Sequence, residues 1–198
     1  MYTFSTLEKI PVDQLVSTFN EAFKNYFTNV HLTQNQLKEK IEVERIRLEL
    51  SPAAFADGEL VGFILHGVDS IDYQTTAYNG GTGIVAAHRG QRLVRQMYDS
   101  ILPKLKSENV EKCQLEVITK NTPAIRAYEG IGFEKKRELI CFSGSVNPVH
   151  EDTQLQIREI LNPDWKMITQ FWDWQPTWQS ILASPVHEPS QLASHLAS

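Results

Sequence analysis

The sequence has few cysteines and no long apolar run, and both scarcities limit what the chain can be. Only two of its 198 residues are cysteines, Cys113 and Cys141, and they form no Cys-x-x-Cys pair. We therefore expect two reduced thiols in a cytoplasmic protein. No pair of histidines has the spacing of a metal site. The longest apolar run, Leu60–Leu65, is too short to cross a bilayer, and the first residues lack the pattern of a secretory signal. We expect no metal and no membrane partner.

An excess of positive charge is also missing. The formal net charge is −5, so general binding to nucleic acid or to an anionic membrane is not expected. The local distribution differs, because the stretch from Tyr73 to Tyr98 contains no Asp or Glu but includes Arg89, Arg92 and Arg95. This local basic stretch leaves an anionic ligand open.

Hydrophobic periodicity predicts an α/β chain. The expected strands cover residues 1–8, 53–56, 60–65, 78–86, 113–118 and 133–142, and the expected helices cover residues 11–27, 34–47, 93–105 and 122–131. This mixed order predicts a sheet with helices on both faces. Pro103 is expected to kink or end the helix in which it lies.

The passage from the strand ending near Ala86 into the next helix carries the chemistry. A helix start offers free backbone N–H groups and a positive dipole end, and Gly90 lets a phosphate approach without a Cβ in the way. A diphosphate ligand fits this stretch. A solvated helix start that happens to be basic fits it equally well, so both interpretations stay open.

Two motifs give the chain a family resemblance. TGIVAAHRGQRLV (Thr82–Val94) resembles the coenzyme-A-binding strand and loop of GNAT N-acetyltransferases. NTPAIRAYEGIGF (Asn121–Phe133) is similar to the second motif of that family, through Asn121, Ala124, Tyr128, Gly132 and Phe133. The resemblance covers about residues 1–146. It implies a mixed, mostly antiparallel central sheet with helices on both faces and a splayed pair of strands that holds acyl-CoA.

The loop departs from the family pattern at two positions. Arg92 stands where the family has glycine, and Val94 stands where it has a small residue. Both residues still supply backbone N–H groups, but their side chains fill space that smaller residues leave open. The guanidinium of Arg92 could instead pair with a coenzyme A phosphate.

The resemblance implies acetyl-CoA as the co-substrate and assigns residues to it. The pantetheine arm would lie along a strand backbone that could also steady the oxyanion, the pyrophosphate would rest on loop N–H groups, and the second motif would add two side chains. The residues in question are Ile84, Val85 and Ala86 for the arm, Arg89, Gly90, Gln91, Arg92, Leu93 and Val94 for the pyrophosphate, and Asn121 and Tyr128 from the second motif.

Tyr128 is the expected general acid for the leaving thiolate, although it also lies on an apolar helical face and could be a core residue. Glu116 is the expected base, with a structural role as the alternative. Glu21, Asp69 and Asp72 are weaker candidates for the base.

Three aromatic residues after the first helix, Phe23, Tyr26 and Phe27, are expected to shape the acceptor pocket, with a core role as the alternative. The predicted function is acetyl transfer from acetyl-CoA to a primary amine of a small molecule or a protein, by direct attack in a ternary complex. The alternative is a catalytically weak or inactive acyl-CoA-binding or regulatory module.

The last 50 residues differ in composition, because all four tryptophans fall there. Longer proteins that resemble this chain carry a second lobe, so we divide the chain into a GNAT domain (1–146), a Trp-rich extension (147–183) and a disordered tail (184–198). The extension is expected to be a partial second lobe, with a strand over 153–160 and a helix over 165–182. It would cover the first lobe or pair with a second subunit as a homodimer. Its tryptophans are Trp165, Trp172, Trp174 and Trp178.

Overall fold

The computed structural model describes residues 1–28, 30–71, 73–145, 164–173 and 176–180. These residues fall into two compact units. The first comprises Met1–Glu134 together with the described residues from Trp178 onward, and the second comprises Lys135–Thr177. The strand expected over 153–160 and the tail expected over 184–198 lie outside the described residues.

A five-stranded sheet forms the first unit. Its strands are β1 (Tyr2–Thr6), β2 (Pro52–Ala56), β3 (Glu59–Ile71), β4 (Gln74–Ile84) and β5 (Lys112–Leu115). They lie side by side in chain order, with antiparallel pairing from β1 to β4 and parallel pairing between β4 and β5. The hairpin between β2 and β3 turns at Asp57 and Gly58, whose φ angles of 50° and 88° suit a two-residue turn of type I′. The prediction of a mostly antiparallel mixed sheet is confirmed.

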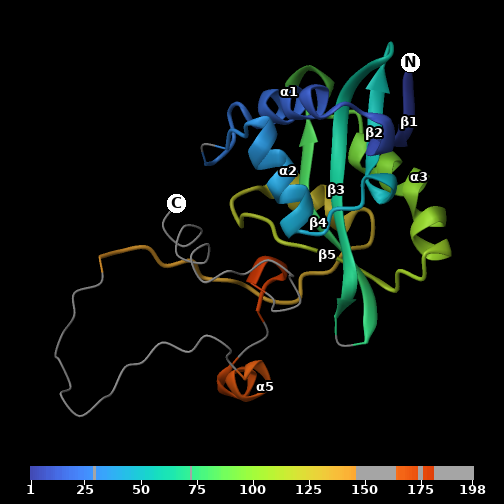
Figure 1. Cartoon of the computed structure of the whole chain (residues 1–198). Helices are drawn as coiled ribbons and strands as arrows, with labels where there is room; N and C mark the ends of the chain where they lie inside the picture. Colours follow the sequence, from blue (N-terminus) through green and yellow to red (C-terminus); the bar gives the residue numbers. More distant parts are fainter. Residues whose placement is uncertain (29, 72, 146–163, 174–175, 181–198) are drawn as a thin grey trace. The chain divides into compact units, whose positions relative to one another are not determined.

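Four helices pack on this sheet, α1 (Val12–Phe23), α2 (Gln34–Val43), α3 (Leu93–Ser107) and α4 (Thr122–Glu129). Helices α1 and α2 cover one face and α3 covers the other (Figure 1). A capping box between Thr33 and Gln36 begins α2. Helix α1 ends at Phe23, so Tyr26 and Phe27 follow the helix and the expectation of a helix to residue 27 was wrong.

Strict alternation along the central strands builds a separate core on each face. Ala53, Phe63 and Leu65 join the core under α1 and α2. Their neighbours Ala54 and Ile64 join the core under α3. Because successive strand residues point to opposite faces, an almost wholly apolar strand such as β3 serves both cores.

Pro103 does not end α3, one of the two effects expected of it, because the helix runs on to Ser107. The last turn is held by Leu105, which is buried in the core under the helix. The helix ends at Ser107, and Asn109 two residues later has a φ of 57° in the left-handed region, while the Val110 N–H donates to the Leu105 carbonyl at 3.0 Å.

Strands β4 and β5 part soon after they pair. Their ladder has four residue pairs and ends with Asn79 opposite Leu115, although β4 continues to Ile84. At the same point the register between β3 and β4 shifts, since Leu65 faces Gly81 and His66 faces Asn79, which leaves Gly80 in a bulge. The structure therefore has the splayed pair of strands that the resemblance implied.

The described residues 133–142 form no strand, so the prediction of a strand there was wrong. Ile140 and Phe142 are 77% and 90% exposed. A strand needs a neighbour that satisfies its N–H and C=O groups, and the nearest expected neighbour, 153–160, lies outside the described residues. The second unit also contains α5 (Trp165–Ile168) and a 3₁₀ turn at Thr169–Phe171.

Candidate active site

The start of α3 is a helix N-terminus without a side-chain cap. Gly90 and Arg92 before it have φ angles of 77° and 57°, both in the left-handed region. Arg92 is the N-cap residue, and its side chain accepts no hydrogen bond from the helix. The first-turn N–H groups, including those of Leu93 and Val94, therefore remain available to an anion. The family glycine falls on Arg92, at the one position here where glycine would relieve the backbone.

The three arginines of the basic stretch have different surroundings. Arg89 donates to two carbonyls, from Nε to Ile84 at 3.1 Å and from Nη2 to Ala22 near the C-terminus of α1 at 2.7 Å. Arg95 donates to the Gly130 carbonyl at 3.1 Å and lies near Asp99. Within the described part of the chain, the guanidinium of Arg92 has no such partner and is exposed. Arg92 is the arginine free to meet a phosphate.

Two of the backbone donors expected to serve the co-substrate are already bonded. The Val85 N–H donates to the Val61 carbonyl at 2.9 Å, because pairing with β3 continues past the end of β4. The Arg89 N–H donates to the Ala86 carbonyl at 3.3 Å, because residues 86–88 form a 3₁₀ turn. The Val85 N–H therefore cannot take the oxyanion role expected of the 84–86 backbone. The backbone N–H of Arg89 is likewise not free to bind a pyrophosphate.

A chain of buried hydrogen bonds reaches Tyr128 from the interior. The His66 ring bonds the Leu50 carbonyl through Nδ1 at 2.8 Å, so its Nε2 accepts from the Tyr98 hydroxyl at 3.4 Å. The Asn79 amide nitrogen donates to the hydroxyls of Tyr98 at 3.2 Å and of Tyr128 at 3.5 Å. Because Asn79 donates, this hydrogen bond does not use the proton of Tyr128.

The electrostatic surroundings keep the residues of this hydrogen-bond network uncharged. Burial lowers the pKa of His66 to about 4, against which the Leu50 hydrogen bond acts weakly. Burial likewise raises the pKa of Tyr128, and hydrogen bonds with Thr82 and Asn79 partly offset the effect. Tyr128 thus keeps its proton at neutral pH. Its ring also contacts Phe133 edge to face, with centroids 5.6 Å apart, and so packs on the core under α3.

Asn121 lies at the start of α4 and faces the loop after α1. Its side-chain oxygen accepts from the Ala124 N–H at 3.3 Å, which caps the helix. Its amide nitrogen donates to the Tyr26 hydroxyl at 3.5 Å. The structure therefore brings together two predicted site residues, Asn121 and Tyr26, that are far apart in the sequence.

The other two aromatic residues expected at the acceptor site differ in exposure. Phe23 stacks on Phe19 with centroids 4.6 Å apart and packs on the core under α1. Phe27 is 54% exposed and meets Tyr26 edge to face at 5.3 Å. Phe23 thus has the core role that was its alternative, whereas Tyr26 and Phe27 extend from the helix end.

The expected base, Glu116, contacts Tyr78 and is exposed. The Tyr78 hydroxyl donates to Glu116 Oε2 at 3.4 Å. Burial raises the pKa of Tyr78, and the charges of Glu116 and Glu44 raise it further. Of the weaker candidates, Asp69 pairs with Arg45 and Glu21 pairs with Lys24, and Asp72 lies outside the described residues.

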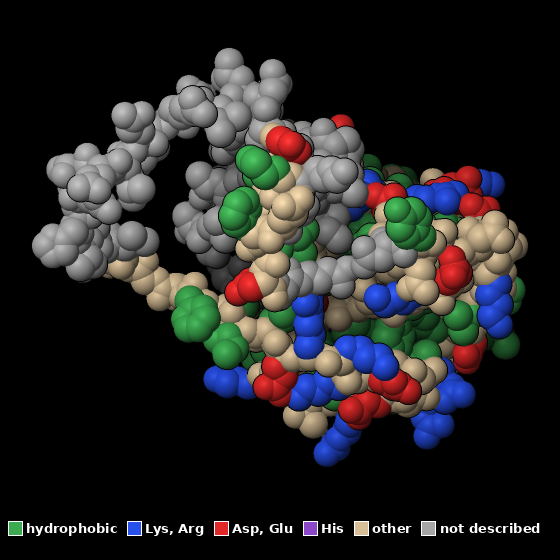
Figure 2. Space-filling model, turned by 90° about the horizontal axis from the view of Figure 1, so that it is seen from below, with side chains coloured by type: hydrophobic (Ala, Val, Ile, Leu, Met, Phe, Trp, Pro, Cys, Tyr) green, Lys and Arg blue, Asp and Glu red, His purple; other side chains and the backbone are tan. Residues whose placement is uncertain are grey.

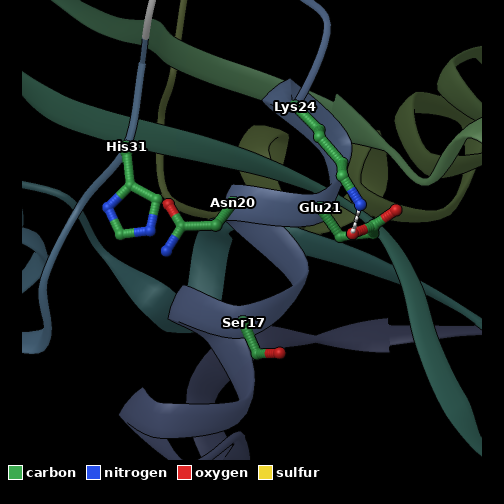
Figure 3. Close-up of a pocket in the computed structure, with 5 residues that line it drawn as sticks. All are labelled: Ser17, Asn20, Glu21, Lys24 and His31. Carbon is green, nitrogen blue, oxygen red and sulfur yellow. Dashed lines mark ion pairs between the residues drawn. The ribbon is translucent and has the colours of Figure 1, made fainter.

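A hollow of about 450 Å³ lies elsewhere, on the outer side of α1 (Figure 3). The amide of Asn20 exchanges two hydrogen bonds of 2.9 Å with the Leu32 backbone and so fixes the segment after the helix. The hollow includes Glu21, one of the weaker candidates for the base, and none of the residues predicted for the co-substrate. Its lining consists of Ser17, Asn20, Glu21, Lys24 and His31.

The sequence analysis did not identify Glu44 or Asn79 as candidate site residues. Asn79 belongs to the AYNGG stretch before the loop, and its position beside three glycines was a usable signal. Glu44 stands in a charged helical segment with no motif around it. Only the packing of that segment against the sheet distinguishes it from Glu42.

The sequence led us to expect no metal, no membrane partner and no general binding to nucleic acid. In the described ranges no cluster of His, Cys, Asp and Glu has the arrangement of a metal site, and no helix there is long and apolar enough to span a membrane. On the face shown in Figure 2, basic and acidic side chains are interspersed.

Comparisons with known proteins agree with this geometry. The family model described as the Acetyltransferase (GNAT) family matches residues 14–133. A search among curated proteins returns no match.

Several solved structures similar to this chain are acetyltransferases. The aminoglycoside acetyltransferase AAC(6')-Iy, in complex with a bisubstrate analogue, has a TM-score of 0.57 and 13% identity over 74% of this chain and 99% of its own. The ribosomal-protein-alanine N-acetyltransferase from Escherichia coli has a TM-score of 0.54 and 20% identity over 69% and 80%. Glucosamine-6-phosphate N-acetyltransferase from Arabidopsis thaliana has a TM-score of 0.54 and 12% identity over 73% and 99%. At these identities the likeness establishes the fold.

Proposed function

The chain belongs to the GNAT acetyltransferase family, and we propose that it transfers the acetyl group of acetyl-CoA to a primary amine by direct attack in a ternary complex. The observation that carries the proposal is the parting of β4 and β5 at Asn79 and Leu115. The open side of β4 there runs toward the uncapped start of α3.

The residues present fit acetyl-CoA at both ends. The pyrophosphate would rest on the free N–H groups at the start of α3, with Arg92 as a cation beside it. From Ala86 back to Gly80 the chain spans about 20 Å at about 3.3 Å per residue, which suits an extended pantetheine arm. In this arrangement the thioester end lies near the Gly80 bulge rather than at residues 84–86. Asn121 would contribute its amide nitrogen, because its oxygen caps α4.

Bound acetyl-CoA supplies a thioester, whose C–S bond breaks as the acceptor nitrogen forms a new bond to carbon. Tyr128 provides the proton for the departing sulfur. Its hydroxyl accepts from Asn79, so that bond does not use the hydroxyl's own proton. A phenol with a raised pKa is a weak acid, so transfer to a thiolate of pKa about 8.5 needs the hydrogen bonds with Thr82 and Asn79, which lower the pKa of Tyr128.

The acceptor is the amine of a small molecule or of a protein. Both kinds occur among the structures of similar fold, one of which carries an aminoglycoside analogue in its site and another of which acts on a ribosomal protein. Tyr26 and Phe27 extend from the end of α1 and would contact the acceptor. We place the protein in the cytoplasm, where its two free cysteines stay reduced.

Thermal unfolding with and without millimolar acetyl-CoA tests the first half of the proposal. A ligand at about 100 times its Kd stabilises the folded state by about 2.7 kcal/mol, which is visible as a shift of a few degrees. Thiol release with a panel of primary amines then tests turnover. No thermal shift in a cooperatively unfolding sample would contradict the proposal.

An acyl-CoA-binding module without turnover is the second candidate. It is supported by Arg92 in place of the family glycine and by the bonded N–H of Val85. A thermal shift without thiol release from any amine of the panel would favour it.

A further inference from the structure

A buried carboxylate lies at the point where β4 and β5 part. The side chain of Glu44 is 9% exposed. Its Oε1 pairs with Lys40 and accepts from Gln179 Nε2 at 2.7 Å. Its Oε2 is buried and has no hydrogen-bond partner within the described ranges. Because a buried carboxylate oxygen left unpaired is costly, this oxygen calls for a donor.

The unpaired oxygen points at the bulge of β4. A Cβ placed on Gly80 would lie 2.3 Å from Glu44 Oε2 and 3.6 Å from the Tyr78 ring, so all three groups meet on one face of the sheet. Gly80 is the first residue of β4 beyond its ladder with β5. Glycine here lets the carboxylate reach the backbone, which no larger residue would allow.

This face is opposite to the one that holds Tyr128. Ala77 belongs to the core under α3, and Asn79 bonds Tyr98 and Tyr128 there. Tyr78, between them in the strand, points to the other face. The split between the strands is thus flanked by a phenol on one face and by a carboxylate on the other.

Residues from the C-terminal part of the chain fix the position of Glu44. The Trp178 indole N–H donates to the Glu44 carbonyl at 3.2 Å, and the indole is 1% exposed. The guanidinium of Arg45 lies 4.9 Å above the same ring. Trp178 stacks on Tyr78, whose hydroxyl faces Glu116. Two carboxylates, Glu44 and Glu116, therefore lie near Tyr78.

We propose that Glu44 Oε2 receives the ammonium group of the acceptor at the bulge and removes its proton before attack. This inference rests on the proposed function and names its acceptor class, a primary amine that arrives as a cation. One N–H bond of the ammonium breaks and an O–H bond forms on Oε2, while the electron pair stays on nitrogen and makes it the nucleophile. Trp178 and Gln179 are positioning residues, and Glu116 adds negative charge near Tyr78.

The main variant is Glu44→Gln, and the matched control is Glu42→Gln, an exposed residue two positions earlier in the chain. For an amine that the wild type acetylates, Glu44→Gln should lower kcat/KM at pH 7 about 100-fold while the acetyl-CoA thermal shift is retained. The loss should shrink as the pH approaches the amine pKa of about 10, because free amine then needs no base. Glu42→Gln should match the wild type throughout.

A wild-type pH profile and wild-type kcat/KM in Glu44→Gln would overturn the inference and leave the proposed function intact. Where Glu44→Gln does not fold, Glu44→Asp keeps the charge and should retain part of the activity with the wild-type pH profile. If Glu44→Asp folds but has no activity, the reaction requires the longer side chain of glutamate. An altered pH profile would overturn the inference.

A binding measurement keeps the test independent of turnover. Panel amines are titrated into the protein without acetyl-CoA, and the fluorescence of the tryptophans is followed. Binding should weaken at least about tenfold in Glu44→Gln, the loss expected for one charge-assisted hydrogen bond. Equal binding by the two proteins, or no binding of any amine by the wild type, would overturn the inference even if acetyl-CoA binds as proposed.

Discussion

The indole ring of Trp178 lies parallel to the phenol ring of Tyr78, with centroids 5.2 Å apart and 5° between the ring planes. Gly67 leaves room for the indole, because a Cβ there would lie 3.1 Å from the ring. The contact attaches the C-terminal part of the chain to the face of the sheet that carries Glu44. We therefore expect Trp178→Ala to lower the free energy of unfolding by about 3 kcal/mol, the usual cost of a large buried aromatic ring.

Denaturant unfolding measures this loss, and Trp172→Ala is its control because Trp172 is 38% exposed. The control should stay within about 0.5 kcal/mol of the wild type. Equal stability of Trp178→Ala and the wild type would mean that the indole does not occupy this place in solution.

Removing the hydroxyl of Tyr128 should abolish most turnover. Tyr128→Phe keeps the ring against Phe133 but loses the group that accepts from Asn79. We expect kcat to fall about 100-fold with the acetyl-CoA thermal shift retained, as for the loss of a general acid. Tyr73→Phe, at a fully exposed tyrosine, is the matched control. Acetylation at the wild-type rate by Tyr128→Phe would remove the acid assignment.

Replacing Arg92 by the glycine of the family pattern should separate the effect of backbone strain from the effect of the charge. A non-glycine residue in the left-handed region costs about 1–2 kcal/mol, so Arg92→Gly should raise the free energy of unfolding by about 1 kcal/mol. Arg92→Ala should bring no such gain. Both variants should weaken acetyl-CoA binding about tenfold at low salt, if the guanidinium meets a phosphate.

Calorimetric titration at two salt concentrations measures the binding. Tighter binding by Arg92→Gly than by the wild type would show that space for the phosphate matters more than the charge. In that case the arginine would be an obstacle rather than a ligand.

His66 should make the stability depend on pH between about 4 and 6.5. Its pKa is about 4 in the folded protein, whereas a histidine exposed to water has a pKa of about 6.5, so the unfolded chain binds the proton first. The stabilisation is therefore complete above about pH 6.5 and is lost as the pH falls toward 4, by about 3 kcal/mol in all.

Urea unfolding of the wild type and of His66→Gln across this range measures the difference. Carboxylates titrate alike in both proteins, so the difference between the two curves isolates the histidine. Parallel curves would mean that His66 is not buried in its neutral form.

The local pattern of residues was enough to predict most elements. A short apolar run identified Leu60–Leu65 as a strand, and Asp57-Gly58 identified the turn before it, because both signals depend on neighbours in the chain. The errors occurred where distant contacts decide. Pro103 stays within α3 because Leu105 is held by the core, and residues 133–142 form no strand because a strand needs a partner that their own sequence does not supply.

The sequence by itself determined the family and the order of the elements through α4, because these depend on motifs and short-range periodicity. Only the tertiary structure decided which groups are free to act. It bonded the Val85 N–H to Val61, joined Asn79 to Tyr128, and brought Glu44 and Trp178 to the bulge at Gly80. The physical reason is that availability of a donor or a carboxylate is set by what packs against it, and those partners come from segments far away in the chain.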